Sequence, residues 1–364
     1  MKKKRIVVKI GSSSLTNTKG EIDESRLNEH VCALAELRRE GHEVILVSSG
    51  AVAAGFARLG YCSRPVTIKG RQAAAAIGQG LLVQTYNEKF MEHQLTAAQL
   101  LLTRHDFSNR DRYKNAVATT IELLERGVIP IINENDTVSV DELTFGDNDM
   151  LSALVSGFVH ADQLIILTDI NGLYNGNPRT NPSAIKYDYL QEVTEPMIGA
   201  ADANGSKVGT GGMKSKLLAA KTAMSLGVPV FIGTGTGSRK LVDVLEGHGD
   251  GTYIANQSLK PVNIRKQWIA LHSDPNGIIY VDQGAEEAIL YNGKSLLPAG
   301  VFKVKGTFQK GDVVQVFGTH GQIGKGEINC SSDELKKAME NKEEHHTSIL
   351  SFVEVIHREG WVQV

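Results

Sequence analysis

Three glycine-rich stretches of the chain combine small residues with lysine or serine, as anion-binding loops do. Lys9 precedes Gly11 at the end of an apolar run, Ser49 precedes Gly50 after another, and residues 209–216 form a lysine-containing third stretch. Glycine lets backbone N–H groups approach an anion closely, and lysine adds a point charge. None of the three matches the Walker A or the Gly-x-Gly-x-x-Gly pattern. Each could also be an ordinary turn or helix start, so the anion-binding hypothesis depends on their neighbours.

Polar clusters stand where other apolar runs end. Residues 133–136 directly follow one apolar run, Thr168 and Asp169 follow another, and residues 146–149 precede a helical pattern. In open α/β sheets, ligands bind at the carboxyl ends of the parallel strands. Each cluster could be a turn or a helix cap by itself. Together with the lysines of the glycine-rich stretches, they predict one composite site.

The candidate reactive groups in that site are Lys9, Lys216 and Asp149, and no histidine or cysteine falls in the glycine-rich stretches or the polar clusters. This set fits a reaction that needs no general base. A carboxylate with a pKa of about 4.3 is already a nucleophile at neutral pH, so its phosphorylation from ATP requires alignment and charge neutralisation only. We expect the lysines to flank the transferred phosphoryl group and Asp149, between them, to hold both in place.

The elements that must position these groups alternate between short β-branched runs and helical patterns over roughly the first 250 residues. This alternation predicts an α/β domain with a mainly parallel sheet. The predicted strands are 5–10, 43–47, 97–102, 128–132, 163–167 and 228–232, and the predicted helices are 24–40, 68–93, 113–125, 151–159 and 214–226. Gly41, Gly127 and Gly227 are expected to end three of these helices.

The pattern changes near residue 256 to short strands separated by turns. The predicted strands are 277–281, 288–290, 301–306, 313–317 and 348–354. They indicate a small, mostly β domain. The predicted organisation is therefore an α/β domain over 1–257, a linker over 258–275 and the β domain over 276–364.

Composition excludes several classes of protein. The 364 residues contain 39 Lys and Arg against 41 Asp and Glu, so an anionic ligand must be met by a few placed cations rather than by a basic surface. The three cysteines have neither disulfide-framework nor zinc-site spacing, which favours the reducing cytoplasm. The apolar run after the basic start is too short for a signal peptide, and no run approaches a membrane span.

At this point the motifs are recognisable. VVKIGSSSLT, SSGAVAAG, LLTRHDF, INENDTVSV, GDNDMLSALV, LTDINGLY and GTGGMKSK follow one another in the sequence. In this order they resemble the amino-acid kinase family, and most closely its members that act on glutamate. The resemblance implies a three-layer α/β sandwich and ATP-dependent phosphorylation, with Mg²⁺, of the γ-carboxylate of L-glutamate. The product would be L-glutamyl 5-phosphate, the first intermediate of proline biosynthesis.

The resemblance also implies residue roles. Lys9, Lys216 and Asp149 would be catalytic. The predicted glutamate-binding residues are Ser49, Asn133, Asp136 and Asn148. The predicted nucleotide-binding residues are Lys9, Gly11, Thr168, Asp169, Thr210, Gly211, Gly212, Met213, Lys214, Ser215 and Lys216. No metal ligand is predicted.

The C-terminal segments GIIYVDQGAEEAIL, LLPAGV and FQKGDVV are similar to a PUA domain, a module often found in RNA-modifying proteins. Residues 260–364 contain 12 Lys and Arg against 13 Asp and Glu. Since phosphate contacts dominate RNA affinity, we expect this module to tune activity or oligomerisation rather than to bind RNA.

Some alternatives remain open. The acceptor could instead be N-acetylglutamate, aspartate, carbamate or UMP, or the chain could be an RNA-binding protein with a degenerate kinase domain, against which the full set of lysines and Asp149 speaks. The resemblance further implies a homo-oligomer without membrane association and feedback inhibition by proline near the glutamate site. We expect inhibitor determinants around Asp106 and Glu142.

Overall fold

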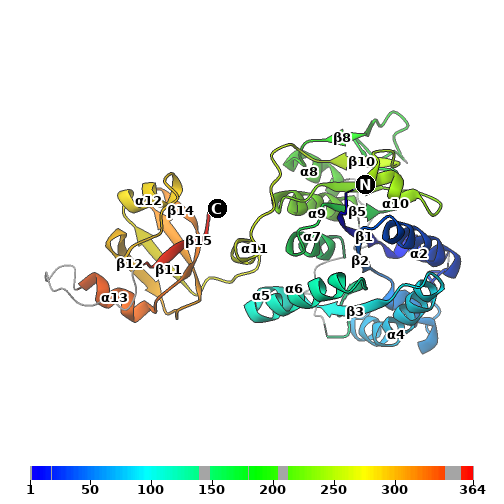
Figure 1. Cartoon of the computed structure of the whole chain (residues 1–364), viewed down its shortest axis with the longest axis horizontal. Coiled ribbons are helices and arrows are strands. Elements are labelled where there is room, and N and C mark those ends of the chain that lie inside the picture. The colour runs from blue at the N-terminus through cyan, green and yellow to red at the C-terminus, as the bar shows by residue number, and fades with distance from the viewer. Residues whose placement is uncertain are drawn as a thin grey trace. The chain divides into compact units, whose positions relative to one another are not determined.

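The computed structural model describes residues 2–17, 19–138, 148–178, 180–203, 212–340 and 354–363. The chain forms two compact units (Figure 1). The first comprises Met1–Asp106 and Lys114–Val262, and the second comprises Phe107–Tyr113 and Asn263–Val364. The second unit therefore includes a short segment from the N-terminal half of the sequence.

The first unit is built on an eight-stranded sheet. Across the sheet the strands are β3 (Ala97–Leu102), β4 (Ile129–Glu134), β2 (Glu43–Ser48), β1 (Arg5–Ile10), β5 (Gln163–Leu167), β9 (Val230–Gly233), β10 (Gly251–Ile254) and β8 (Tyr189–Leu190). Neighbouring strands are parallel except for β9 and β10. The mainly parallel sheet predicted from the sequence is confirmed, and the six predicted strands lie within two residues of the observed ones.

Helices cover both faces of this sheet. In chain order they are α1 (Ser12–Leu15), α2 (Glu24–Arg39), α3 (Ala51–Gly55), α4 (Ile68–Glu92), α5 (Arg104–Ser108), α6 (Arg110–Glu125), α7 (Asn148–Phe158), α8 (Glu195–Ala203), α9 (Met213–Ser225) and α10 (Lys240–Leu245). Figure 1 shows α2, α4 and α10 on one side of the sheet and α6, α7 and α9 on the other. A short ribbon of β6 (Leu173–Tyr174) and β7 (Lys186–Tyr187) follows β5.

The alternation of side chains along β1 decides which face its lysine occupies. Ile6, Val8 and Ile10 belong to the apolar core shared with α2, α4 and α10. Successive side chains of a strand point to opposite faces, so Val7 and Lys9 face the side covered by α7. Lys9 is 3% exposed in an otherwise apolar buried strand, which already indicates a partner of opposite charge on that side.

Glycines end helices and bring two of them together. Gly41, Gly127 and Gly227 have positive φ angles after α2, α6 and α9, which confirms the predicted helix ends. A Cβ on Gly78 of α4 would lie 1.8 Å from the carbonyl oxygen of Ala51 on α3. The backbones of α3 and α4 are therefore in direct contact, and only glycine permits this approach.

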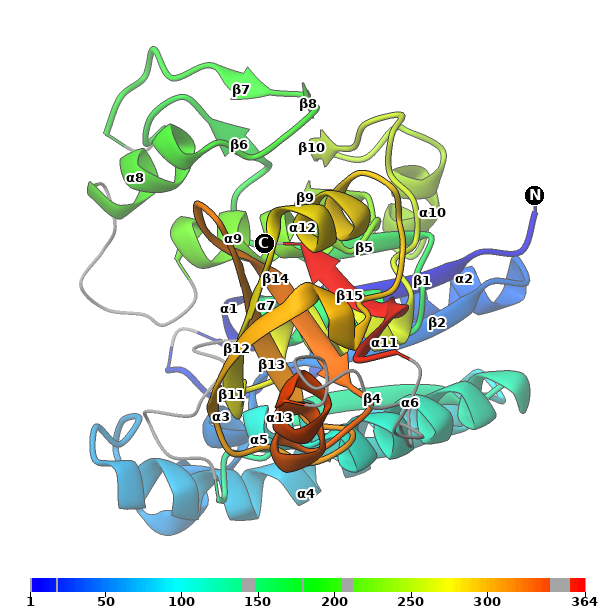
Figure 2. The same ribbon diagram turned by 90° about the vertical axis from the view of Figure 1, so that its left-hand side faces the viewer.

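The second unit is mostly β, as predicted. Its five-stranded sheet has the order β12 (Val301–Gly306), β11 (Gly277–Val281), β13 (Val313–Gly318), β14 (Gly321–Ile328) and β15 (Ile356–Gln363). Figure 2 shows these strands from a second direction. Its helices are α11 (Ile264–Leu271), α12 (Gln283–Leu290) and α13 (Ser332–Glu340). Within the described ranges of both units, no helix is long and apolar enough to cross a membrane.

One strand predicted in this unit is wrong. Residues 288–290 are the last turn of α12, in which Ile289 is buried. Asp282 caps the N-terminus of this helix by accepting a hydrogen bond from the Ala285 N–H. A three-residue apolar run cannot distinguish a strand from a helix turn. The predicted strand 348–354 lies outside the described residues except for Glu354. Helix α11 lies within the segment 258–275.

A buried carboxylate holds the segment Phe107–Tyr113 inside the second unit. Glu327 on β14 accepts from Arg265 Nε at 2.7 Å and lies 2.6 Å from Arg110 Nη1. The aromatic rings at both ends of the segment pack against the ring of His272, with centroids 5.1 and 5.6 Å away. An ion cluster and an aromatic cluster thus fix a segment that is remote in sequence.

Candidate active site

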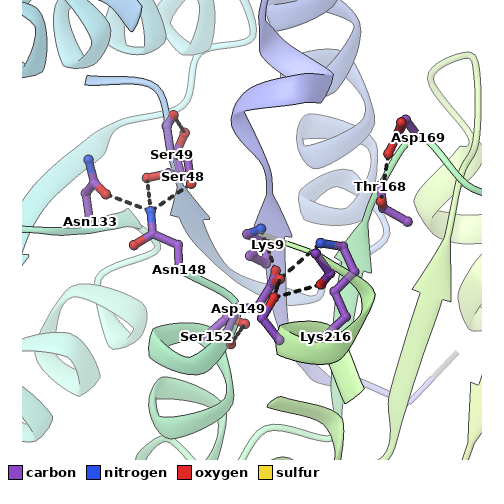
Figure 3. A network of polar contacts seen from close by, with 12 residues as sticks. Lys9, Ser48, Ser49, Asn133, Asn148, Asp149, Ser152, Thr168, Asp169 and Lys216 are labelled. Atoms are coloured by element: carbon purple, nitrogen blue, oxygen red, sulfur yellow. Dashed lines mark hydrogen bonds and ion pairs between the residues drawn. The ribbon is translucent and has the colours of Figure 1, made fainter. Parts of the chain in front are cut away.

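Asp149 lies between two lysines in the first unit. Its Oδ1 is 2.5 Å from Lys9 Nζ, and its Oδ2 is 3.1 Å from Lys216 Nζ (Figure 3). Ser215 Oγ is 3.0 Å from the same Oδ2. The side chains are 4%, 0% and 7% exposed for Lys9, Asp149 and Lys216. The structure thus brings together the three residues predicted to be catalytic.

Three elements place these side chains. Lys9 comes from β1 on the face covered by α7, and Asp149 lies in the first turn of α7. Helix α9 begins at Met213, so Ser215 and Lys216 lie in its first turn, and α7 packs against α9. Two helix N-termini therefore converge on the cluster, and the partial positive charge of each favours an anion there.

The charges of this cluster do not cancel. Burial alone would raise the pKa of Asp149, but the ammonium groups of Lys9 and Lys216 outweigh burial and hold that pKa below its ordinary value. With the carboxylate ionised and two lysines protonated, the trio has a net charge of +1. A buried cluster with this net positive charge is suited to a bound anion such as a phosphoryl group.

A second cluster consists of amide and hydroxyl groups. Asn148 Nδ2 lies 2.9 Å from both the Ser48 carbonyl oxygen and Ser49 Oγ, and 2.8 Å from Asn133 Oδ1 (Figure 3). Asn133 and Asn148 are 2% and 6% exposed. Three of the four residues predicted to bind the acceptor are thereby joined at the carboxyl ends of β2 and β4 and the start of α7.

The two clusters meet at one dipeptide. Asn148 and Asp149 are the first two residues of α7, and Figure 3 shows their side chains turned to different clusters. Successive residues of a helix are rotated by about 100° about its axis, so the side chains of two neighbouring residues at its end can point to different clusters. The start of α7 therefore fixes the amide cluster relative to the charged one.

Asp136, the fourth predicted acceptor residue, stands apart from this network. It follows the end of β4, and its backbone N–H donates to the Glu134 carbonyl oxygen. Burial and the nearby Glu134 carboxylate raise the pKa of Asp136 to about 6, while Arg71 on α4 opposes this shift. A carboxylate next to a second one is suited to a cationic group such as an ammonium.

The predicted nucleotide-binding residues lie in several places. Thr168 and Asp169 follow β5, where Thr168 Oγ1 donates to Asp169 Oδ1 at 3.2 Å. A Cβ on Gly11 would lie 3.3 Å from Lys9 Nζ, so any larger residue would press on this ammonium. Gly212, Met213 and Lys214 lie at the start of α9. Thr210 and Gly211 lie outside the described residues.

The segments proposed for inhibitor determinants are only partly described. Asp106 Oδ2 accepts hydrogen bonds from the backbone N–H and the hydroxyl of Thr103, both at 2.7 Å, at the start of α5. Glu142 lies outside the described residues. For Asp106 the geometry therefore indicates a role in starting a helix.

Sequence reasoning missed two polar residues of α4 that contact the amide cluster. Gln79 Oε1 accepts from Asn133 Nδ2 at 2.8 Å, and the hydroxyl of Tyr86 is 2.9 Å from Ser48 Oγ. Burial raises the pKa of Tyr86. Both residues lie on the buried stripe of α4 with Ala75 and Leu82. Glutamine on an otherwise apolar helical stripe is the signal that could have revealed the first of them.

Comparisons with known proteins agree with this geometry. Residues 4–234 match the model of the Amino acid kinase family, and residues 277–350 match the PUA domain. The chain belongs to the amino acid kinase family. Membership of a kinase family implies the use of ATP. The predicted fold class, an α/β kinase domain followed by a mostly β PUA-like domain, is confirmed.

Within this family, curated relatives that resemble the whole chain are glutamate 5-kinases. Glutamate 5-kinase 1 of Bacillus subtilis (strain 168) is 63% identical over 364 residues, covering 100% of both chains. Glutamate 5-kinase of Oceanobacillus iheyensis is 60% identical, covering 100% of this chain and 98% of the relative. Among solved structures, carbamate kinase from Giardia lamblia bound to AMP-PNP has a TM-score of 0.52 at 17% identity, covering 70% of this chain and 99% of that one. This last similarity supports the fold alone.

Proposed function

We propose that this protein transfers the γ-phosphoryl group of ATP to the γ-carboxylate of L-glutamate, giving L-glutamyl 5-phosphate and ADP in the first step of proline biosynthesis. The observation that supports it most is the placement of Asp149 between Lys9 and Lys216, one residue from the amide cluster of Asn148. The full-length similarity to glutamate 5-kinases selects glutamate among the possible acceptors.

The acceptor supplies its own nucleophile. A glutamate γ-carboxylate with a pKa of about 4.3 is ionised at neutral pH and needs no base. One of its oxygens forms a bond to the γ-phosphorus, while the bond from that phosphorus to the β–γ bridging oxygen breaks. ADP leaves with that electron pair, and no proton is transferred in the step.

The protein supplies charge and alignment. Negative charge spreads over the equatorial oxygens of the transferred group and grows on the leaving oxygen. In this proposal Lys9 and Lys216 neutralise it from two sides, and Asp149 keeps both ammonium groups in place. Because these groups are already positioned and shielded from water, little reorganisation is needed in the transition state.

The substrate assignments follow the two clusters. Ser49, Asn133 and Asn148 would bind glutamate through the amide cluster, and Asp136 would face its ammonium group. The nucleotide would lie at Gly11, Thr168, Asp169 and the start of α9, together with the predicted residues 210 and 211 that precede it.

Mg²⁺ completes the proposal as a partner of the nucleotide. Among the residues that the structure describes, no group of three or more Asp, Glu, His or Cys side chains is arranged to hold a metal ion. Mg²⁺ in kinases takes many of its ligands from phosphates and water, so this donor set fits an ion that accompanies ATP. When bound, Mg²⁺ would neutralise phosphate charge, and we assign it no ligand from this chain.

A chemical trap tests the proposal directly. The acyl phosphate product reacts with hydroxylamine to give γ-glutamyl hydroxamate, which is measured by its ferric complex. We expect hydroxamate only when both ATP and glutamate are present, and little with aspartate or N-acetylglutamate. Folded protein that forms none with glutamate would refute the proposal.

The proposal also includes inhibition by proline, the oligomeric state and the cellular setting. We expect proline to inhibit at subsaturating glutamate, a homo-oligomer in sedimentation experiments, and a reducing cytoplasmic setting, in keeping with the free thiols of Cys32, Cys62 and Cys330. Unchanged activity with proline would remove the inhibition from the proposal without affecting the kinase assignment.

A further inference from the structure

The amide cluster contacts a buried glutamine that the proposed function does not use. Gln79 on α4 is 8% exposed, and its Oε1 accepts from Asn133 Nδ2 at 2.8 Å. Its own Nε2 is buried and has no hydrogen-bond partner among the described residues. The Oε1 of this amide therefore has a hydrogen-bond partner among the described residues, whereas its Nε2 has none.

Packing does not explain an amide at this position. The neighbouring buried residues on the same stripe of α4 are Ala75, Leu82 and Tyr86, so the stripe itself is largely apolar around Gln79. A buried N–H without an acceptor costs free energy, whereas a methionine of similar length would fill the same space without that cost. The feature that distinguishes glutamine from methionine here is the acceptor Oε1, and Asn133 uses it.

The backbone around Gln79 is held closely against the segment that carries Ser49. Gly78, the preceding residue, lets α4 contact Ala51 of α3, as described above, and a Cβ on Gly55 would lie 2.0 Å from the Ala74 carbonyl oxygen. Helix α3 begins two residues after Ser49. The backbone at Gln79 is therefore held close to the Ser48–Ser49 end of the amide cluster.

The amide of Gln79 contributes to the orientation of two others, together with the Glu134 N–H, which donates to Asn133 Oδ1, and the Ser48 carbonyl oxygen, which accepts from Asn148 Nδ2. Because Gln79 Oε1 receives Asn133 Nδ2, the Oδ1 of Asn133 faces the donors Asn148 Nδ2 and the Glu134 N–H, at 2.8 and 2.9 Å. If the Asn133 amide were flipped, its Nδ2 would face these two donors. With Nδ2 of Asn148 so engaged, Figure 3 shows its Oδ1 turned away from the cluster.

We propose that Gln79 is a positioning residue of the acceptor site: by accepting from Asn133 Nδ2, it holds Asn133 Oδ1 against Asn148 Nδ2 and so supports the Asn148 amide in the orientation that faces the substrate. The inference rests on the proposed function in placing the acceptor at Asn148. Gln79 acts through Asn133 and does not itself contact the reacting atoms. Its loss should therefore weaken acceptor binding more than it slows phosphoryl transfer.

The test compares three variants with the wild-type chain. Gln79→Met removes the acceptor atom, and Gln79→Glu keeps one. Gln84→Met is the matched control on the exposed side of α4, where Gln84 Nε2 donates to Glu88. For Gln79→Met we expect the KM for glutamate to rise about tenfold, with kcat and the KM for ATP within about threefold of wild type. Its melting temperature should change little, because the unmatched Nε2 donor of Gln79 is removed while Asn133 Nδ2 loses its acceptor.

Each outcome separates the possibilities. Gln79→Glu should recover most of the lost affinity, and Gln84→Met should match wild type in every constant. Equal KM values for Gln79→Met and Gln84→Met would overturn the inference, as would an equal loss in kcat and both KM values. Failure of wild-type protein to form hydroxamate from glutamate refutes the proposed function instead, so the two failures are distinguishable.

Discussion

Two buried carboxylates in this protein each contact two cations, and their surroundings differ. Asp149 contacts Lys9 and Lys216, and all three side chains are at most 7% exposed. Glu327 in the second unit contacts Arg110 and Arg265, which are 33% and 35% exposed. The excess positive charge around Glu327 thus reaches water, whereas that around Asp149 does not.

The choice of cation matches this difference. Guanidinium groups offer directed, planar donors that hold a fixed partner, and they suit a cluster that keeps a chain segment in place. An ammonium group is a compact charge with three donors, so it can contact Asp149 and a phosphoryl oxygen at once. In the proposed function, the carboxylate-centred arrangement with a buried charge binds a ligand, whereas the one with a solvated charge holds a chain segment in place.

Removing a lysine from the buried cluster should have the largest effect. For Lys216→Ala we expect kcat to fall by about a thousandfold or more, because its charge matters most in the transition state, while glutamate affinity changes little. Steady-state kinetics together with calorimetric binding of glutamate measure the two separately. A turnover number near that of wild type would contradict the role given to Lys216.

Removing the carboxylate between the lysines should affect stability as well as activity. Asp149→Asn leaves two buried ammonium groups without their anion, and breaking such a cluster destabilises proteins by about 3–5 kcal/mol. Denaturant unfolding measures this loss, which added ATP should partly offset. The matched control is Ser152→Ala, which removes only a hydroxyl that donates to the Asp149 carbonyl oxygen.

The corresponding change in the second unit should be smaller and confined to stability. Glu327→Gln keeps the shape but removes the charge, and the solvated arginines limit the loss to about 1–3 kcal/mol. We expect kcat to stay within about threefold of wild type. A loss of turnover comparable with that of Lys216→Ala would mean that the two clusters do not differ in function.

A third carboxylate, that of Asp136, extends the comparison because its pKa of about 6 makes its charge depend on pH. With a pKa of about 6, Asp136 loses its charge as pH falls through that value, so the KM for glutamate should rise about tenfold for each further unit. In the protein without substrate, pH acts on stability in the opposite direction. Because folding raises the pKa of Asp136 from its ordinary value of 3.8 to about 6, the free energy of unfolding decreases as pH rises through this range.

Asp136→Asn separates these two effects. It should make the KM for glutamate high and nearly independent of pH, and it should raise the melting temperature of the free protein at pH 8 but not at pH 4. A wild-type KM profile that is flat between pH 5 and 7 would contradict the assignment of Asp136 to the substrate ammonium.

The sequence predicted the first unit better than the second for physical reasons. Buried parallel strands such as Arg5–Ile10 are continuous apolar runs, and the strand-end rule then groups Lys9 with the polar clusters. In the second unit, β14 contains three glycines that obscure its alternation, and β15 was likewise not predicted. Local patterns are informative where an element is buried and regular.

Pairings between residues that are remote in sequence could not be predicted. Nothing near Arg110 or Glu327 in the sequence indicates that they are partners, since 217 positions separate them and neither lies in a motif. The link from Gln79 to Asn133 is similar, because it joins α4 to β4 across 54 positions of sequence. The chemistry of single residues could be predicted, whereas the supports behind them required the structure.

The composition of the second unit limits how this chain can be divided or recombined. A gene cut after residue 262 would separate Asn263–Val364 from Phe107–Tyr113, although both stretches belong to one unit. A chimaera that exchanges only the C-terminal module with a relative would keep Arg110 but replace Glu327 and Arg265. An exchange that preserves this contact moves residues 107–113 together with the module, so the exchanged unit consists of two pieces of sequence rather than one.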